Sequence, residues 1–181
     1  MQFKILTGLD FDTDFLSTVM DLDKVVYSEE YAGVLENMVA RYEVNRDSFV
    51  CIMDEEKDKL AGYINFFPCT EELYQDIRKN SQVTRDDDIR PDEVAPYSKE
   101  GNHLFIISIV IAPEYRDGKA IVTMMNAWND HLDKLVKRGY PITDICAIAI
   151  SEGGQKVLRN NQFKRERELS DGNIVYARDN I

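Results

Sequence analysis

Residues 103–120, HLFIISIVIAPEYRDGKA, decide the fold of this 181-residue chain. The apolar run over residues 104–111 is typical of a strand buried on both faces of a sheet. The turn after this run leads into a helix, and the first N–H groups of a helix attract anions because they lack partners inside it. The unit therefore predicts a phosphate-binding site beyond the strand end. An ordinary strand-to-helix connection is the alternative interpretation.

An amphipathic helix follows the turn and extends to about residue 138. Its apolar side chains recur at steps of three and four, and so share one face. They are Ile121, Met124, Met125, Trp128, Leu132, Leu135 and Val136. Gly139 and Pro141 predict the helix end. A second apolar run follows at residues 145–150, so strand, helix and strand predict a parallel βαβ unit.

The flanking sequence predicts an α/β domain with a mixed sheet that uses all 181 residues. The charged turn over 54–59 predicts antiparallel N-terminal strands, and Asp171-Gly172 predicts a C-terminal hairpin. The other expected strands cover residues 3–6, 48–53, 60–67, 163–169 and 174–178. The other expected helices cover residues 11–27, 29–42 and 151–161.

An acidic insert at about residues 70–101 separates the N-terminal strands from the βαβ unit. Its start, residues 70–79, predicts a short helix, and a polar connection follows. Residues 83–100 carry six acidic and three basic side chains. Structureless connections longer than about 12–15 residues are uncommon and often functional. The insert is either a solvated surface excursion or a flap that attracts and covers a cationic substrate.

The overall composition excludes several classes of function. The net charge of −11, from 22 basic and 33 acidic side chains, argues against binding to nucleic acid or to anionic membranes and favours cationic partners. The three cysteines and two histidines have no metal-ligand spacing, so we expect no metal site. No signal peptide is visible, and the longest apolar run, about nine residues, is far short of a membrane helix. We therefore expect a cytoplasmic protein.

Three local sequences resemble the GCN5-related N-acetyltransferase (GNAT) superfamily. Residues 109–116, IVIAPEYR, are similar to the family's strand-and-turn motif V-x-P-E-Y-R. Residues 60–64, LAGYI, resemble its aliphatic-Gly-aromatic strand, and residues 151–163 are similar in spacing to a later helix. In element order the resemblance covers essentially the whole chain. It implies a GNAT-like acyl-CoA N-acyltransferase fold, with acetyl-CoA as co-substrate and an amine as acceptor.

The pyrophosphate loop departs from the family pattern [QR]-x-x-G-x-[GA]. Arg116 matches the first position, but Lys119 and Ile121 occupy the small-residue positions, while Gly118 and Ala120 come one residue earlier. Either the loop is shifted by one residue, or the pyrophosphate is held less closely and Lys119 compensates with its charge. The residues that the resemblance implies for cofactor binding are Ile109, Val110, Ile111, Arg116, Asp117, Gly118, Lys119, Ala120 and Ile121.

The usual proton-transfer residues of the family are also missing. Leu158 stands where many members carry an acid tyrosine, and Phe105 where some carry a glutamate base. A thiolate whose conjugate acid has a pKa near 8–9 departs without obligatory protonation. A missing acid therefore slows the reaction, typically by about 10²–10⁴-fold, without preventing it. The resemblance implies that backbone N–H groups at Val110 and Ile111 stabilise the oxyanion.

His103 is the conspicuous candidate for a general base, because it shares a strand face with Phe105 and has an ordinary pKa near 6.5. An exposed side chain at a loop–strand boundary is the alternative. Tyr27, Tyr31 and Asp23 are expected to line the acceptor groove, with simple packing as the alternative.

Three hypotheses about function remain open at this stage. The first is a cytoplasmic acetyltransferase that moves the acetyl group of acetyl-CoA to a primary amine of a small molecule or peptide, with cationic acceptors included. The second is an acyl-CoA-binding regulatory module of the same fold, with weak or no catalysis. The third is an unrelated nucleotide- or phosphate-binding α/β domain. A homodimer is left open.

Overall fold

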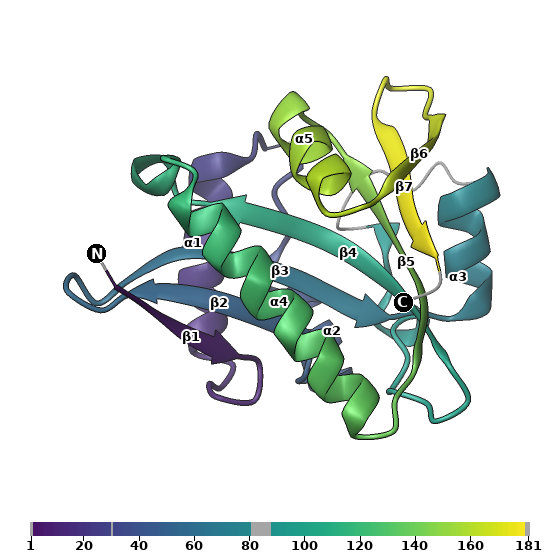
Figure 1. The fold of residues 1–181 in the computed structure, drawn as a ribbon, viewed down its shortest axis with the longest axis horizontal. Coiled ribbons are helices and arrows are strands. Elements are labelled where there is room, and N and C mark those ends of the chain that lie inside the picture. Colours follow the sequence, from purple (N-terminus) through teal and green to yellow (C-terminus); the bar gives the residue numbers. More distant parts are fainter. Residues whose placement is uncertain (1, 30, 81–87, 180–181) are drawn as a thin grey trace.

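A seven-stranded mixed sheet organises the computed structural model, which describes residues 2–29, 31–80 and 88–179. The strand order across the sheet is β1-β2-β3-β4-β5-β7-β6 (Figure 1). The strands are β1 (Phe3–Thr7), β2 (Phe49–Asp54), β3 (Lys59–Pro68), β4 (Asn102–Ile111), β5 (Ile142–Ala149), β6 (Lys164–Glu168) and β7 (Ile174–Asp179). Strands β4 and β5 are parallel, and the other neighbours pair antiparallel. The predicted mixed sheet with a central parallel βαβ unit is confirmed.

Helices cover both faces of this sheet. Figure 1 shows α4 (Lys119–Lys137) and α5 (Glu152–Asn160) in front of the sheet, and α1 (Phe15–Val26) and α2 (Leu35–Val44) behind it. The short α3 (Glu71–Gln75) continues into a π-helical turn, Asp76–Asn80, beside the C-terminal strands. The 3₁₀ turns are Pro91–Glu93 and Pro113–Tyr115.

The predicted apolar stripe of α4 is buried along most of its length. Met124, Trp128 and Leu135 are fully enclosed in the main core, whereas Val136 at the end of the stripe is exposed. A second, smaller cluster lies under α3 and joins Phe67 and Phe105 to Leu73 and Tyr74. The sheet is therefore buried on both faces at β4, as its continuous apolar sequence predicts.

The predicted second helix begins later than the sequence pattern suggests. We expected helix over residues 29–42, but α2 starts at Leu35, and the described residues before it form a turn and an extended segment. Gly33 lies in this segment, and glycine costs about 1 kcal/mol relative to alanine inside a helix. Tyr31 therefore lies in a loop rather than on a helix.

The described part of the acidic insert packs against the fold. Ile89 and Val94 are buried in the second cluster. The Arg41 Nη1 donates to the Ile89 carbonyl at 3.3 Å, and the Ala95 N–H donates to the Pro68 carbonyl at 2.8 Å. The apolar side chains thus anchor this part of the insert, while charged side chains such as Arg90 and Asp92 stay exposed to solvent. The acidic residues 86 and 87 lie outside the described residues.

Two further features bear on function. Over the described ranges, no helix combines the length and apolarity needed to cross a bilayer. In the same ranges, no three His, Cys, Asp or Glu side chains gather closely enough to hold a metal ion.

Candidate active site

A gap opens between β4 and β5 halfway along the two strands. Their parallel ladder runs from Asn102 paired with Ile142 to Ile106 paired with Ala147, and β4 continues beyond it to Ile111. A β-bulge lies at the same point, because Asn65 of β3 pairs with Ser108 while the next residue, Phe66, pairs with Ile106. The extra residue, Ile107, bends β4 away from β5. The two central strands therefore separate where a continuous sheet would otherwise be paired.

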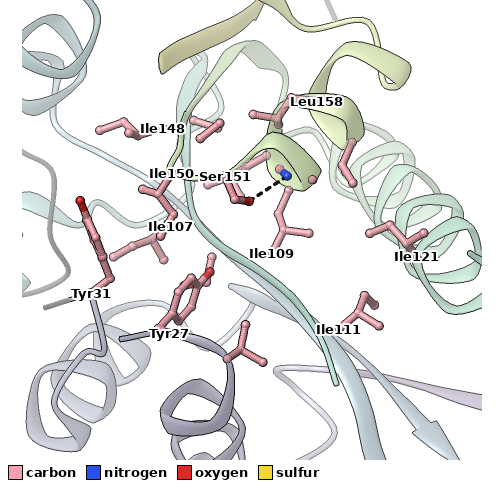
Figure 2. A pocket seen from close by; sticks show the side chains of 18 of the residues that line it. Tyr27, Tyr31, Ile107, Ile109, Ile111, Ile121, Ile148, Ile150, Ser151 and Leu158 are labelled. Atoms are coloured by element: carbon pink, nitrogen blue, oxygen red, sulfur yellow. Dashed lines mark hydrogen bonds between the residues drawn. The ribbon is translucent and has the colours of Figure 1, made fainter. Parts of the chain in front are cut away.

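A cavity of about 690 Å³ fills this gap. Figure 2 shows Tyr27 and Tyr31 on one side, Ile121 and Leu158 on the other, and Ile107 and Ile109 of β4 between them. The lining residues are Val26, Tyr27, Ser28, Tyr31, Ile106, Ile107, Ser108, Ile109, Ile111, Tyr115, Arg116, Gly118, Ile121, Ala147, Ile148, Ala149, Ile150, Ser151, Gly153, Gly154, Val157 and Leu158. The cavity thus reaches from the α1–α2 loop, through the sheet, to the starts of α4 and α5.

Backbone amides of β4 face the gap in alternation. The Ala112 N–H donates to the Ala61 carbonyl of β3 at 2.9 Å, and the β3–β4 pairing is regular from Ile111 back to Ser108. Successive N–H groups of a strand point to opposite sides, so the Val110 N–H faces β3 while the Ile109 and Ile111 N–H groups face the gap. Of the two N–H groups predicted to stabilise the oxyanion, the one of Ile111 therefore points toward the cavity and the one of Val110 points away from it.

The cavity ends at the predicted pyrophosphate loop. Gly118 lies immediately before α4 with φ of 92°, a left-handed conformation that favours glycine. A Cβ at Gly118 would meet no atom within 4 Å, so the loop surface there is open. The Asp117 carboxylate accepts from the Lys119 N–H at 3.0 Å, and the Arg116 Nε donates to the Ile111 carbonyl at 3.1 Å. Glycine therefore stands at the helix start, one residue before the family position.

The structure separates the implied cofactor residues into two groups. Ile109, Ile111, Arg116, Gly118 and Ile121 line the cavity. Val110 and Ala120 have buried side chains that belong to the core, and the exposed side chains of Asp117 and Lys119 are outside the lining.

The start of α5 forms a wall of the cavity that we did not predict from the sequence. Ser151 caps this helix, since its Oγ accepts from the Gly154 N–H at 3.1 Å, and Gly153 and Gly154 lie beside the cavity. Ser-Glu-Gly-Gly at residues 151–154 was the available signal: a capping serine followed by residues that let a ligand approach the backbone. The starts of α4 and α5 both border the cavity, and helix starts favour negative charge.

The two predicted substrate tyrosines lie together at the other end. Tyr27 and Tyr31 both line the cavity, with Ser28 between them (Figure 2). The Tyr31 hydroxyl accepts from the Asn173 Nδ2 at 3.3 Å, and Asn173 also donates to Asp171 at 2.9 Å. These bonds tie the α1–α2 loop to the β6–β7 turn at this end of the cavity.

Tyr115 contributes to the cavity wall a phenol that stays protonated. Its hydroxyl donates to the Asp54 Oδ2 at 2.9 Å. Burial, together with the bond to this carboxylate, raises the pKa of Tyr115 to about 12. The side chain is therefore a neutral, fixed part of the cavity at physiological pH.

His103, the predicted base, lies away from the cavity. His103 comes five residues before Ser108 on β4. At about 3.3 Å per residue, their backbones are roughly 16 Å apart along the strand. Its Nδ1 is 2.6 Å from an Asp144 oxygen and its Nε2 is 3.0 Å from a Glu71 oxygen, while its ring lies against Tyr74 of α3. His103 does share a face with Phe105, as expected, but α3 and the second cluster cover that face.

Leu158 forms part of the apolar wall of the cavity (Figure 2). Two other tyrosines, Tyr140 and Tyr176, have partners elsewhere in the fold. The Tyr176 hydroxyl is engaged with Arg159 at 3.1 Å, and Tyr140 packs against Tyr97. Neither belongs to the cavity lining, and the wall at Leu158, where the resemblance implies an acid, is aliphatic.

Known proteins resemble this chain in structure rather than in sequence. No protein-family model and no curated protein matches the sequence. The loading GNATL domain of CurA from Lyngbya majuscula superposes with a TM-score of 0.70 and 13% identity, over 99% of this chain and 98% of that one. The mosquito arylalkylamine N-acetyltransferase like 5b superposes with a TM-score of 0.62 and 11% identity, over 99% of this chain and 100% of that one.

A third similar structure, the PaiA N-acetyltransferase of Thermoplasma acidophilum in complex with coenzyme A, gives a TM-score of 0.59 and 13% identity. This likeness covers 99% of this chain and 100% of that one. The chain therefore has the GNAT fold from end to end, as the motif at residues 109–116 predicted.

Proposed function

We propose that this chain transfers the acetyl group of acetyl-CoA to a primary amine by direct attack. The observation that carries the proposal is the cavity between β4 and β5, which opens toward two helix starts on one side and a tyrosine-lined loop on the other. Solved N-acetyltransferases with the same fold, one of them in complex with coenzyme A, support this assignment.

The cofactor would enter from the α4 side. We propose that the pyrophosphate lies against the loop Arg116–Gly118, where the guanidinium of Arg116 and the N–H groups at the start of α4 favour negative charge. The pantetheine would then follow the free edge of β4 at Ile109 and Ile111. Lys119, exposed beside this loop, would add a screened attraction rather than a direct contact.

The chemistry would take place at the bulge in β4. A thioester carbonyl placed beside the Ile109 N–H would have its developing negative charge stabilised by a donor that is already fixed in position. Loss of one such donor typically costs about 10²–10³-fold in rate, so this is a large contribution. The amine nitrogen would approach from the side of Tyr27 and Tyr31.

The acceptor side favours an amine with a compact, uncharged body. Ile107, Ile148 and Ile150 line it together with the two tyrosines, and among the described lining residues Arg116, at the cofactor end, carries the one charge. A second cationic group on the acceptor would lose its hydration without gaining a carboxylate partner in this wall, which is costly. We therefore propose small arylalkyl or alkyl monoamines ahead of polyamines.

The test is thiol release from acetyl-CoA with a panel of amines: phenethylamine, a short peptide with a free N-terminus, and spermidine. We expect turnover with phenethylamine and a lower kcat/KM with spermidine. Binding of acetyl-CoA without turnover on any amine would favour the regulatory-module hypothesis instead.

We propose a cytoplasmic location for this chain. The three cysteines are free and buried, which fits that location.

A further inference from the structure

A chain of three polar side chains leads from the cavity wall into the core. Ser108 of β4 lines the cavity, and Tyr63 of β3 is its diagonal neighbour on the same face of the sheet, because Ser108 pairs with Asn65. The Tyr63 hydroxyl in turn donates to the Asp23 Oδ1 on α1. Asp23 is 3% exposed and Tyr63 is 0% exposed, so this carboxylate and phenol are held inside the protein.

Such an arrangement is not explained by stability. A buried carboxylate loses its hydration, and hydrogen bonds at best offset that cost. An apolar pair of the same shape would fold at least as well in many proteins. The Asp23–Tyr63 pair therefore calls for a role beyond packing.

The position of the chain suggests that role. Ser108 follows the bulge residue Ile107 and precedes Ile109, whose N–H faces the gap. The open end of the chain is thus next to the place where the amine, the thioester carbonyl and the oxyanion donor would meet. Phe105, the residue at the position that the resemblance implies for a base, faces the second cluster and so offers no base to this place.

We propose that Ser108, Tyr63 and Asp23 carry the proton away from the acceptor nitrogen, an inference that rests on the proposed transferase function. Attack on the thioester carbonyl forms the C–N bond and leaves a positively charged N–H group. Its proton passes to the Ser108 oxygen, while the serine proton passes to Tyr63 and the tyrosine proton to Asp23. The C–S bond then breaks, CoA departs as a thiolate, and the proton on Asp23 returns along the chain to the thiolate or to water.

The surroundings of Tyr63 keep its phenol protonated, as a proton relay through this side chain requires. Burial, and then the nearby carboxylate of Asp23, raise the pKa of Tyr63 well above its ordinary value. Tyr63 therefore remains protonated across the physiological range and exchanges protons without becoming a phenolate. The groups that face it are Asp23 from α1, Tyr27 at the end of α1 and Ser108 from β4.

The experiment compares Asp23→Asn and Tyr63→Phe with the matched control Tyr42→Phe. Tyr42 is also fully buried, and its hydroxyl donates to the carbonyls of Gly8 and Phe11 outside the cavity. We expect the first two variants to lose about 10²-fold or more in kcat, with little change in the KM for acetyl-CoA. The kcat of these two variants should also continue to rise at pH values where the kcat of the parent is already constant, because solvent must then remove the proton. Tyr42→Phe should keep the parental kcat and pH profile.

Ser108→Ala tests the same chain without altering the buried pair, and Ser108→Thr should restore the hydroxyl and the rate. Parental kcat and an unchanged pH profile in Ser108→Ala and Tyr63→Phe would overturn the proton path while leaving the acetyltransferase assignment intact. If the parent itself released no thiol with any amine, the proposed function would fail, and the proton path with it.

Discussion

Replacing Leu158 with alanine separates an apolar wall from a catalytic acid. Leu158 is 2% exposed and borders the cavity. Leucine-to-alanine changes in cores cost about 2–5 kcal/mol, and the cost grows with the volume of the void that remains. Because the space here joins an existing cavity, we expect the lower end, about 2 kcal/mol. At about 2–4 °C per kcal/mol for a domain of this size, Tm should fall by roughly 4–8 °C.

The same change should leave kcat within about tenfold, since no proton donor is lost; removal of a true acid costs about 10²–10⁴-fold. Calorimetric unfolding gives Tm, and thiol release gives kcat and KM. Leu158→Met is the control, because volume-conserving changes usually cost less than about 1.5 kcal/mol. An unchanged Tm together with a hundredfold loss of kcat would show that this position acts in the chemistry and that the reasoning is wrong.

Three further predictions follow from the cavity and the core. Acetyl-CoA at ~100 times its Kd should add about 2.7 kcal/mol to the free energy of unfolding and raise Tm, and ATP at the same concentration should not. Arg116→Ala should weaken calorimetric acetyl-CoA binding more than Lys119→Ala, and both losses should shrink at high salt. Burial raises the pKa of Asp47, but His131 and Arg138 outweigh this and hold it below its ordinary value. Stability from Asp47 should therefore be complete above about pH 4 and decline as the pH falls further, and Asp47→Asn should flatten the acid part of Tm against pH.

The sequence was sufficient for the central βαβ unit, because two strong signals coincide there. The apolar run at 104–111 specifies a strand buried on both faces, and the three-and-four spacing of α4 specifies one buried stripe. The end of the cavity at Arg116 and Gly118 follows from the same unit. The orientation of single groups does not follow from it. Ala120 has the small side chain of a phosphate-binding residue, yet its helical position turns that side chain into the core.

The rest of the site depends on contacts between distant segments. Asp23 and Tyr63 are forty residues apart in the chain, and their hydrogen bond exists only because α1 packs behind β3. His103 shows the converse case. Strand alternation correctly placed it on the face of Phe105, but it could not reveal that α3 covers that face. Which helix covers which side of a strand is a tertiary property, and no local pattern in β4 encodes it.

The separation of β4 from β5 has a consequence for amide hydrogen exchange. The Val110 N–H faces β3 in a regular ladder, whereas the Ile109 and Ile111 N–H groups face the gap between the strands. One strand should therefore show slow and fast exchange at alternate residues in the free protein. A ligand seated along this edge would occupy the place of the missing strand and slow the fast positions, leaving Val110 unchanged. Amide exchange measured at each residue of β4 would thus show whether a ligand occupies the gap between the strands.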